Sequence, residues 1–143
     1  MRMRCYRVLV AVLLQCLALL AAVAPASAAP NNIAAELAVE AAVAPGGTGT
    51  LAIHMKPQPG WHGYWRNPGD AGLGMDLAWT LPDGARAGEP RYPVPGTLLI
   101  SGLMNHVYES EYAVLVALKV PPGAKPGTSV PIALDARWLA CTD

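Results

Sequence analysis

The chain is predicted to fold as an all-β sandwich, and three observations carry that prediction. Apolar and polar residues alternate in several short runs, most clearly over 48–56, 111–120 and 129–139. Fourteen prolines and fourteen glycines separate these runs. No segment after the N-terminal apolar stretch has a firm helical pattern. Short alternating strands bounded by turn residues are typical of two packed antiparallel sheets, and we expect about seven of them.

The N-terminal segment is predicted to be a secretory signal peptide covering residues 1–28. Residues 1–7 carry three arginines and no acidic residue, and residues 8–23 are almost wholly apolar. Ala26-Ser27-Ala28 then supplies small residues at the two positions that a signal peptidase reads. The apolar stretch is marginal for a membrane span, which needs about 20 such residues. Cleavage would leave one domain, residues 29–143, in a bacterial periplasm.

Removing the signal changes the charge balance of the chain. The whole sequence holds ten Lys and Arg against ten Asp and Glu, whereas residues 29–143 keep seven basic residues against ten acidic ones, a net charge of −3. A nucleic-acid-binding protein needs a basic patch, so this balance argues against that class.

Cysteine usage points to one position. Cys5 and Cys16 lie inside the predicted signal, so Cys141 is the single cysteine of the exported part. An odd cysteine in an exported protein indicates a reactive thiol or a missing partner. A buried, inert cysteine is the alternative, because free cysteines often lie in cores. The position of Cys141 at a strand end, beside Thr142 and Asp143, favours an accessible thiol.

The first half of the domain contains one clear strand. Residues 34–44 are ambiguous, because their Ala and Glu content suits a helix whereas their alternation suits a strand. After a Pro-Gly-Gly turn, residues 48–56 are predicted to form a half-buried strand. Residues 61–65 form an aromatic stretch, and the Asn, Pro, Gly and Asp residues of 67–72 predict a loop. The inner face of the clear strand would be Leu51, Ile53 and Met55.

The second half contains three predicted strands and one edge segment. Strands are expected over 75–81, 111–120 and 129–139. Residues 86–91 are expected at a sheet edge, because the prolines that follow cannot donate to a strand ladder. The inner faces would be Met75, Leu77 and Trp79, then Val114, Val116, Leu118 and Val120, and finally Val130, Ile132, Leu134, Ala136 and Trp138.

The remaining chemical motifs are weak. Trp61, Trp65 and Trp79 are interpreted as core residues, because large aromatic side chains suit the core of a small sandwich. The histidines show no ligand spacing such as His-x-x-x-His, and a metal site needs three or four converging ligands. Neither a phosphate-binding loop nor a nucleophile elbow is present. We therefore expect no metal and no cofactor.

Four ordered segments nevertheless carry a family resemblance. Residues 60–72 read Gly-Trp-His-Gly-Tyr-Trp-Arg-Asn-Pro-Gly-Asp-Ala-Gly, and residues 79–84 read Trp-Thr-Leu-Pro-Asp-Gly. Residues 105–109 read Asn-His-Val-Tyr-Glu, and residues 138–141 read Trp-Leu-Ala-Cys. Together they resemble the N-terminal periplasmic domain of DsbD-type thiol:disulfide interchange proteins, including the ScsB-like copper-tolerance branch. The resemblance extends over residues 33–143.

This resemblance implies both a fold and a function. The fold is an immunoglobulin-like sandwich, which agrees with the strand pattern. The function is a protein-disulfide reductase step, in which the domain receives electrons from a membrane reductase through a thioredoxin-like domain. It then passes them to periplasmic disulfide-containing clients, such as disulfide isomerases and thioredoxin-like proteins of cytochrome c biogenesis. Exchange of this kind runs through mixed disulfides.

The resemblance also implies site residues. Cys141 matches the first of two redox cysteines, and the second should follow a few residues later, whereas this sequence ends at Asp143. The sequence could be a fragment of a longer protein or a truncated form of it, and both alternatives stay open. The family shields its cysteines with a cap loop, expected at residues 105–108, so His106 or Tyr108 would cover Cys141 with Asn105 beside them. His62 and Tyr64 fall where the family places side chains near the cysteines.

Two other functions stay open at this point. The sandwich could be a non-catalytic immunoglobulin-like binding module, because a fold alone does not fix a function. The ScsB-like resemblance also allows a periplasmic copper-tolerance protein, which would need soft ligands that converge in space.

Overall fold

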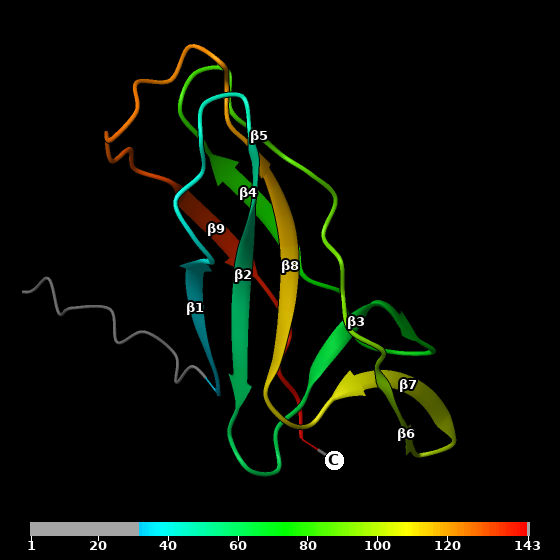
Figure 1. Cartoon of the computed structure of the whole chain (residues 1–143). Helices are drawn as coiled ribbons and strands as arrows, with labels where there is room; N and C mark the ends of the chain where they lie inside the picture. Colours follow the sequence, from blue (N-terminus) through cyan, green and yellow to red (C-terminus); the bar gives the residue numbers. More distant parts are fainter. Residues whose placement is uncertain (1–31, 143) are drawn as a thin grey trace, which may run out of the picture. The chain divides into compact units, whose positions relative to one another are not determined.

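A computed structural model describes residues 32–142, and these residues form nine strands in three sheets (Figure 1). The predicted signal peptide lies outside the described residues. Within the described range no residue is helical, and no helix long and apolar enough to cross a membrane is found there. The strands are β1 (Ile33–Val39), β2 (Thr48–Pro57), β3 (Gly63–Gly69), β4 (Asp76–Thr80), β5 (Arg86–Ala87), β6 (Gly96–Ile100), β7 (Leu103–Tyr108), β8 (Tyr112–Lys119) and β9 (Ala133–Arg137).

Two of the sheets face each other and form the sandwich. The four-stranded sheet has the order β1-β2-β8-β5, and the two-stranded sheet pairs β4 with β9. Leu77 and Trp79 of β4, with Leu134 of β9, pack against the buried cluster of the four-stranded sheet. The predicted all-β sandwich is confirmed.

The core follows directly from the alternation in β2 and β8. Leu51, Ile53 and Met55 of β2 are all buried, as predicted, and they pair in register with Val116, Val114 and Tyr112 of β8. Side chains of successive strand residues point to opposite faces, so one apolar set enters the core while the other faces outward. Burying each such side chain contributes about 1.5–3 kcal/mol relative to leaving it exposed.

Two predicted elements have different bounds. The ambiguous segment 34–44 is a strand over its first part, β1, because it pairs residue by residue with β2 from Ile33 to Val39. The last strand is shorter than predicted, because Pro131 cannot donate to a ladder and pairing starts only at Ala133. Val130 was therefore wrongly placed inward, and it is exposed in the loop that precedes this proline.

The largest correction concerns the three-stranded sheet, whose order is β3-β7-β6. The loop predicted over 67–72 is wrong in its first part, since β3 continues through Pro68 to Gly69, with a register shift along the strand. The cap loop expected at 105–108 is also wrong in conformation, because those residues belong to β7. A hairpin turn at Ser101-Gly102, where both residues have positive φ, joins β6 to β7.

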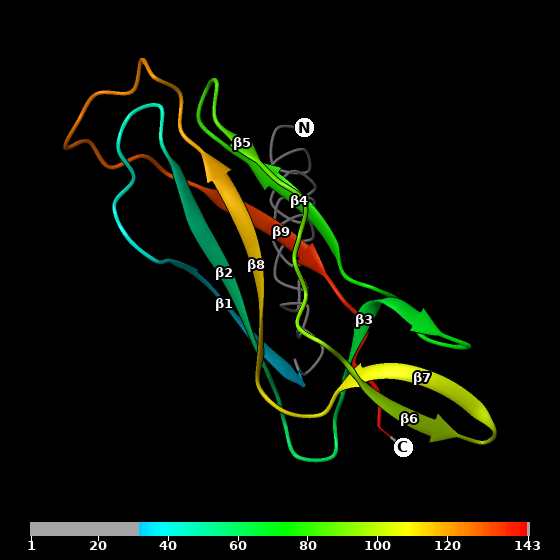
Figure 2. The same ribbon diagram turned by 45° about the vertical axis from the view of Figure 1, so that its right-hand side comes forward.

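The three-stranded sheet reaches sideways from the sandwich, as Figure 2 shows for β6, β7 and the end of β3. Around its turn this projecting hairpin has consecutive apolar residues, Leu98 to Ile100 and Leu103 to Met104. Leu99, Leu103 and Met104 are exposed at its tip. A period-2 pattern is absent from such a sequence, and this is why the hairpin was not predicted.

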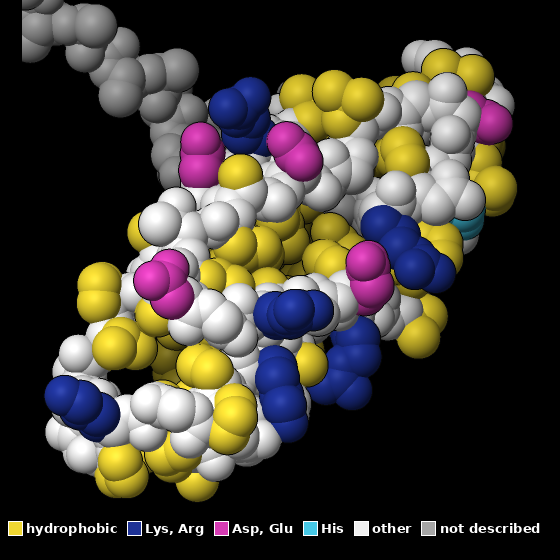
Figure 3. All heavy atoms as spheres, turned by 90° about the horizontal axis from the view of Figure 1, so that it is seen from above, with side chains coloured by type: hydrophobic (Ala, Val, Ile, Leu, Met, Phe, Trp, Pro, Cys, Tyr) yellow, Lys and Arg dark blue, Asp and Glu magenta, His cyan; other side chains and the backbone are white. Residues whose placement is uncertain are grey.

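The opposite end of the sandwich contains an apolar hollow of about 350 Å³. Leu118 of β8 and Val120, which follows that strand, line it together with Ile132 and the turn around Pro82. Figure 3 views the molecule from above and shows hydrophobic side chains in a hollow bordered by charged ones.

Candidate functional site

Cys141 is fixed to the start of β3 by a two-way backbone bridge. The His62 N–H donates to the Cys141 carbonyl oxygen at 2.9 Å, and the Cys141 N–H donates to the His62 carbonyl oxygen at 3.1 Å. In an antiparallel pair of this kind the two side chains lie on the same face of the sheet. The thiol of Cys141 is free and half-buried. The bridge therefore holds the cysteine beside His62 in a defined orientation.

Tyr64 completes the group on that face, two residues after His62. The Nε2 atom of His62 lies 3.2 Å from the Tyr64 hydroxyl, and the two rings meet edge to face at 5.2 Å between centroids. The hydroxyl also forms a hydrogen bond with the Cys141 side chain. Burial, then this hydrogen bond, then the negative charge of the thiolate raise the pKa of Tyr64 from 10.0 to about 12. Tyr64 therefore keeps its proton at neutral pH and can donate it to a thiolate.

A loop over residues 70–74, called the cover loop below, holds the Tyr64 ring in place. Gly72 lies so close that a Cβ atom added to it would overlap the ring. Its φ of +93° is also a conformation that other residues rarely adopt. Glycine is thus required here both for backbone conformation and for the close approach to Tyr64.

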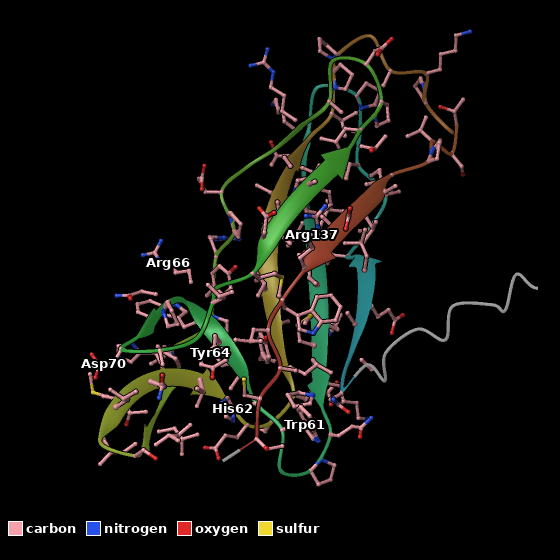
Figure 4. The ribbon with its side chains drawn as sticks, turned by 180° about the vertical axis from the view of Figure 1, so that it is seen from behind. Trp61, His62, Tyr64, Arg66, Asp70 and Arg137 are labelled. Atoms are coloured by element: carbon pink, nitrogen blue, oxygen red, sulfur yellow. The ribbon has the colours of Figure 1, made fainter. Side chains whose placement is uncertain are left out.

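Asn105 and Asp70 fix the cover loop to β7. The Ala71 N–H donates to Asn105 Oδ1 at 3.2 Å, and Asn105 Nδ2 donates to the Leu103 carbonyl oxygen at 3.2 Å. Asp70 donates its N–H to the Met104 carbonyl oxygen at 2.8 Å and accepts the Met104 N–H at its carboxylate, also at 2.8 Å. In Figure 4 the chain runs from His62 past Tyr64 along β3, and Asp70 lies beyond the far end of that strand.

The structure separates the predicted site residues into two groups. Asn105 alternates with His106 and Tyr108 along β7, so it lies on the Cys141 face whereas those two residues lie on the other. His106 meets Trp65 edge to face at 5.6 Å, and its Nδ1 lies 3.1 Å from the Asn67 carbonyl oxygen. Tyr108 stacks on Tyr112 with centroids 4.0 Å apart. His62, Tyr64 and Asn105 are thus brought together on the Cys141 side, whereas His106 and Tyr108 are not.

The tryptophans mostly behave as predicted. Trp65 and Trp79 pack against the core cluster, while Trp61 is half-buried at the turn before β3. No group of three or more His, Cys, Asp and Glu that could hold a metal ion occurs in the part of the chain that the structure describes.

The cover loop is the part of the site that sequence reasoning missed. The sequence predicted a loop over 67–72 by turn chemistry and used 60–72 for the family resemblance, but it assigned no contact between this segment and Tyr64. The spacing of Gly69, Gly72 and Gly74 was the available signal, because glycines clustered without a hairpin pattern mark places where backbone approaches another group closely.

The fold is an all-β sandwich in which the backbone of Cys141 is bridged to His62 and its side chain lies beside Tyr64. These features define a candidate thiol-exchange domain. The family model described as "Thiol:disulfide interchange protein DsbD, N-terminal" matches residues 30–143. The chain therefore belongs to this family.

Comparison with solved structures supports the fold. The N-terminal periplasmic domain of ScsB from Proteus mirabilis superimposes with a TM-score of 0.61 at 18% sequence identity, covering 79% of this chain and 42% of that one. The likeness confirms the immunoglobulin-like fold class, and this chain spans less than half of the ScsB chain. No curated protein matches the sequence.

Proposed function

We propose that this domain is a periplasmic thiol:disulfide interchange module that uses Cys141. In this role it takes electrons from the thioredoxin-like domain of a membrane disulfide reductase. It passes them to periplasmic proteins with disulfides, such as disulfide isomerases and thioredoxin-like factors of cytochrome c maturation. Family membership supports the general function.

The observation that carries the proposal is the environment of the thiol. Cys141 is half-buried, its backbone is fixed by the His62 bridge, and the Tyr64 hydroxyl hydrogen-bonds its side chain. The nucleophile in exchange is the thiolate, so a donor that remains protonated beside it stabilises the reactive form. A cysteine in an apolar core without a polar partner would have no such stabilisation of its thiolate.

The chemical step follows from these groups. The Cys141 thiolate forms a bond with one sulfur of a client disulfide, and the old S–S bond breaks. The second client sulfur leaves with the bonding electron pair as a thiolate, which then takes a proton. The product is a mixed disulfide. A second thiol, which the family resemblance implies, would attack Cys141 to release the reduced client.

Partner contact is supported by the surface around the cover loop. Leu73 on this loop and Met104, whose backbone bonds to Asp70, are both exposed. Exposed apolar side chains that gather in one patch mark protein–protein interaction sites, and these two residues lie on segments joined by hydrogen bonds. A thioredoxin-like partner would present its own disulfide with apolar surface around it.

Trapping of a mixed disulfide tests the proposal. The full chain carrying Cys5→Ser and Cys16→Ser, so that Cys141 is the single thiol, is mixed with a thioredoxin-like protein. That protein keeps one active-site cysteine, blocked with thionitrobenzoate. We expect release of the coloured leaving group and a crosslinked species that disappears on reduction, both absent with Cys141→Ser. A fully reactive Cys141 that never joins this partner would instead favour a non-catalytic binding module.

Export is tested separately. Cells that produce the full chain are fractionated, and the mature N-terminus is determined by mass spectrometry. The proposal expects periplasmic protein that begins at Ala29. Unprocessed protein held in the cytoplasm would contradict the assignment of residues 1–28 as a signal peptide.

A further inference from the structure

The buried contact between His62 and Tyr64 has a role beyond holding the cysteine. We propose that His62 and Tyr64 form a proton relay for Cys141, in which His62 accepts the thiol proton through the Tyr64 hydroxyl. The inference rests on the proposed function and names two positioning residues for it.

The Tyr64 hydroxyl stands between the other two side chains, and the His62 contact and the backbone bridge fix its surroundings. The Tyr64 hydroxyl interacts with the Cys141 side chain on one side and lies 3.2 Å from His62 Nε2 on the other. A phenolic hydroxyl has one proton and can accept as well as donate, so it can serve both neighbours at once. The backbone bridge sets the relative position of His62 and Cys141, so the two ends of this chain of atoms are fixed by one isolated pair of backbone hydrogen bonds.

The proton balance of the relay is simple. In the resting state the thiol S–H donates to the Tyr64 oxygen, and the Tyr64 O–H donates to a neutral His62 Nε2. When the thiol ionises, its proton moves to Tyr64 and the proton of Tyr64 moves to His62. The products are the Cys141 thiolate and the His62 imidazolium. The Tyr64 hydroxyl is restored, and it now donates to the thiolate and accepts from the His62 N–H. Histidine suits the terminal position because its ordinary pKa lies near neutrality.

Burial makes this route important. His62 is 1% exposed and Tyr64 is 6% exposed, so bulk water has little access to either acceptor. The titratable side chains on this face are Tyr64 and Cys141, and the cover loop adds Asp70, whose carboxylate accepts the Met104 N–H. Asn105 and Val107, which β7 contributes to the same face, are uncharged. Among these groups His62 is the one whose ring nitrogen lies within reach of the Tyr64 hydroxyl proton.

Thiol reactivity in the single-cysteine chain tests the relay without a partner protein. The rate of reaction with Ellman's reagent, a small disulfide, is measured against pH. We expect Tyr64→Phe and His62→Gln each to slow the reaction roughly tenfold at neutral pH, the scale of one hydrogen bond to a charged group. Both profiles should move to higher pH and recover in alkali, where hydroxide removes the thiol proton directly.

The double variant distinguishes a relay from two separate effects. If the groups act in series, Tyr64→Phe with His62→Gln reacts no more slowly than Tyr64→Phe alone, because the chain is already broken. If the slowing in the double variant equals the product of the slowing in the two single variants, the relay is overturned. An unchanged rate in His62→Gln would also overturn it and leave Tyr64 acting alone. His54→Gln and Tyr92→Phe, which change the same residue types elsewhere, should react like the parent.

Nitrogen NMR of the histidine side chains checks the proton directly, and it avoids destabilising a buried position. In the parent chain the His62 ring should keep its second proton to a higher pH than it does after Cys141 is alkylated, because a neighbouring thiolate stabilises the imidazolium. A His62 signal that does not change on alkylation would refute the relay.

The two proposals fail in different ways. Loss of partner trapping with intact kinetic coupling would refute the proposed function and leave the relay as a property of the thiol. Normal trapping with no effect of His62→Gln would refute the relay and leave the proposed function standing.

Discussion

The four-stranded and three-stranded sheets differ in the chemistry of the side chains that they bury. Beneath the four-stranded sheet the fully buried side chains are apolar, as with Leu51 and Val116. In and beside the three-stranded sheet, His62 and Asn105 are each 1% exposed. A buried polar group costs free energy unless it is hydrogen-bonded, and no buried side-chain nitrogen or oxygen in the described residues lacks a partner. One sheet stabilises the fold, and the other organises polar groups around a thiol.

The largest expected effect lies in the stabilising sheet. Ile53→Ala removes a side chain that is 2% exposed at the centre of β2 and should lower the free energy of unfolding by about 2–5 kcal/mol. Urea unfolding measures this, and Val94→Ala, at an exposed position, should change almost nothing. The molecules that remain folded should keep the parental reactivity of Cys141. Slower reactivity in the folded state would mean that the two sheets are not separable.

Gly72→Ala should act on the site first. The new Cβ atom would overlap the Tyr64 ring and sit at a φ of +93°, which costs about 3 kcal/mol with the strained backbone. The cover loop should open and Cys141 should react differently, while the core unfolds as one unit as before. Gly102→Ala is the matched control, since it has a φ of +84° but open space around it. Equal effects of the two changes would show that strain, not contact with Tyr64, is the reason for the glycine.

Asn105→Ala should have a smaller effect on the same loop. It leaves the Ala71 N–H without its partner at 3.2 Å and costs about 1.5 kcal/mol. Hydrogen exchange should become faster at the Ala71 amide and stay unchanged in β2 and β8. Uniformly faster exchange throughout the domain would instead place Asn105 among the residues that stabilise the whole fold.

The smallest expected effect is a shift in tyrosine titration. Burial is the main reason that the pKa of Tyr64 rises to about 12, and Cys141 adds to it. Cys141→Ser should therefore lower the pKa of Tyr64 but leave it above 10.0. Absorbance of the tyrosinate ion against pH measures this, with Tyr64→Phe used to assign the signal. A return to 10.0 would show that Cys141, not burial, is the main cause.

The same shifts set the alkaline limit of the fold. Burial also raises the pKa of Tyr108 to about 12, so the folded state keeps protons that the unfolded chain loses above pH 10.0. Stability is then constant below about pH 10 and falls as the pH rises towards 12. Unfolding midpoints measured across this range should show the decline, and it should be weaker in Tyr64→Phe.

The sequence predicted the stabilising sheet better than the site. The alternation of apolar and polar residues identified the inner faces of β2 and β8, because an antiparallel strand with one buried face has apolar residues on that face and polar residues on the other. It failed for β6 and the start of β7, where consecutive residues are apolar, and for β3, which continues through Pro68. The resemblance brought Cys141, His62 and Tyr64 together. It could not assign Asn105 and Tyr108 to opposite faces, because that depends on whether residues 105–108 are a loop or a strand.

The backbone bridge at Cys141 has one more consequence. The side chain of Ile33, the first residue of β1, lies beside Gly63, which follows the bridged His62, so the start of β1 lies at the same end of the domain as Cys141. Polypeptide attached at either end starts its path within reach of Cys141. A tethered thiol–disulfide partner would meet this sulfur at a high local concentration, set by the length of the connecting chain. For a partner joined by such a connecting chain, this effective concentration would add to the affinity that the contact surface supplies.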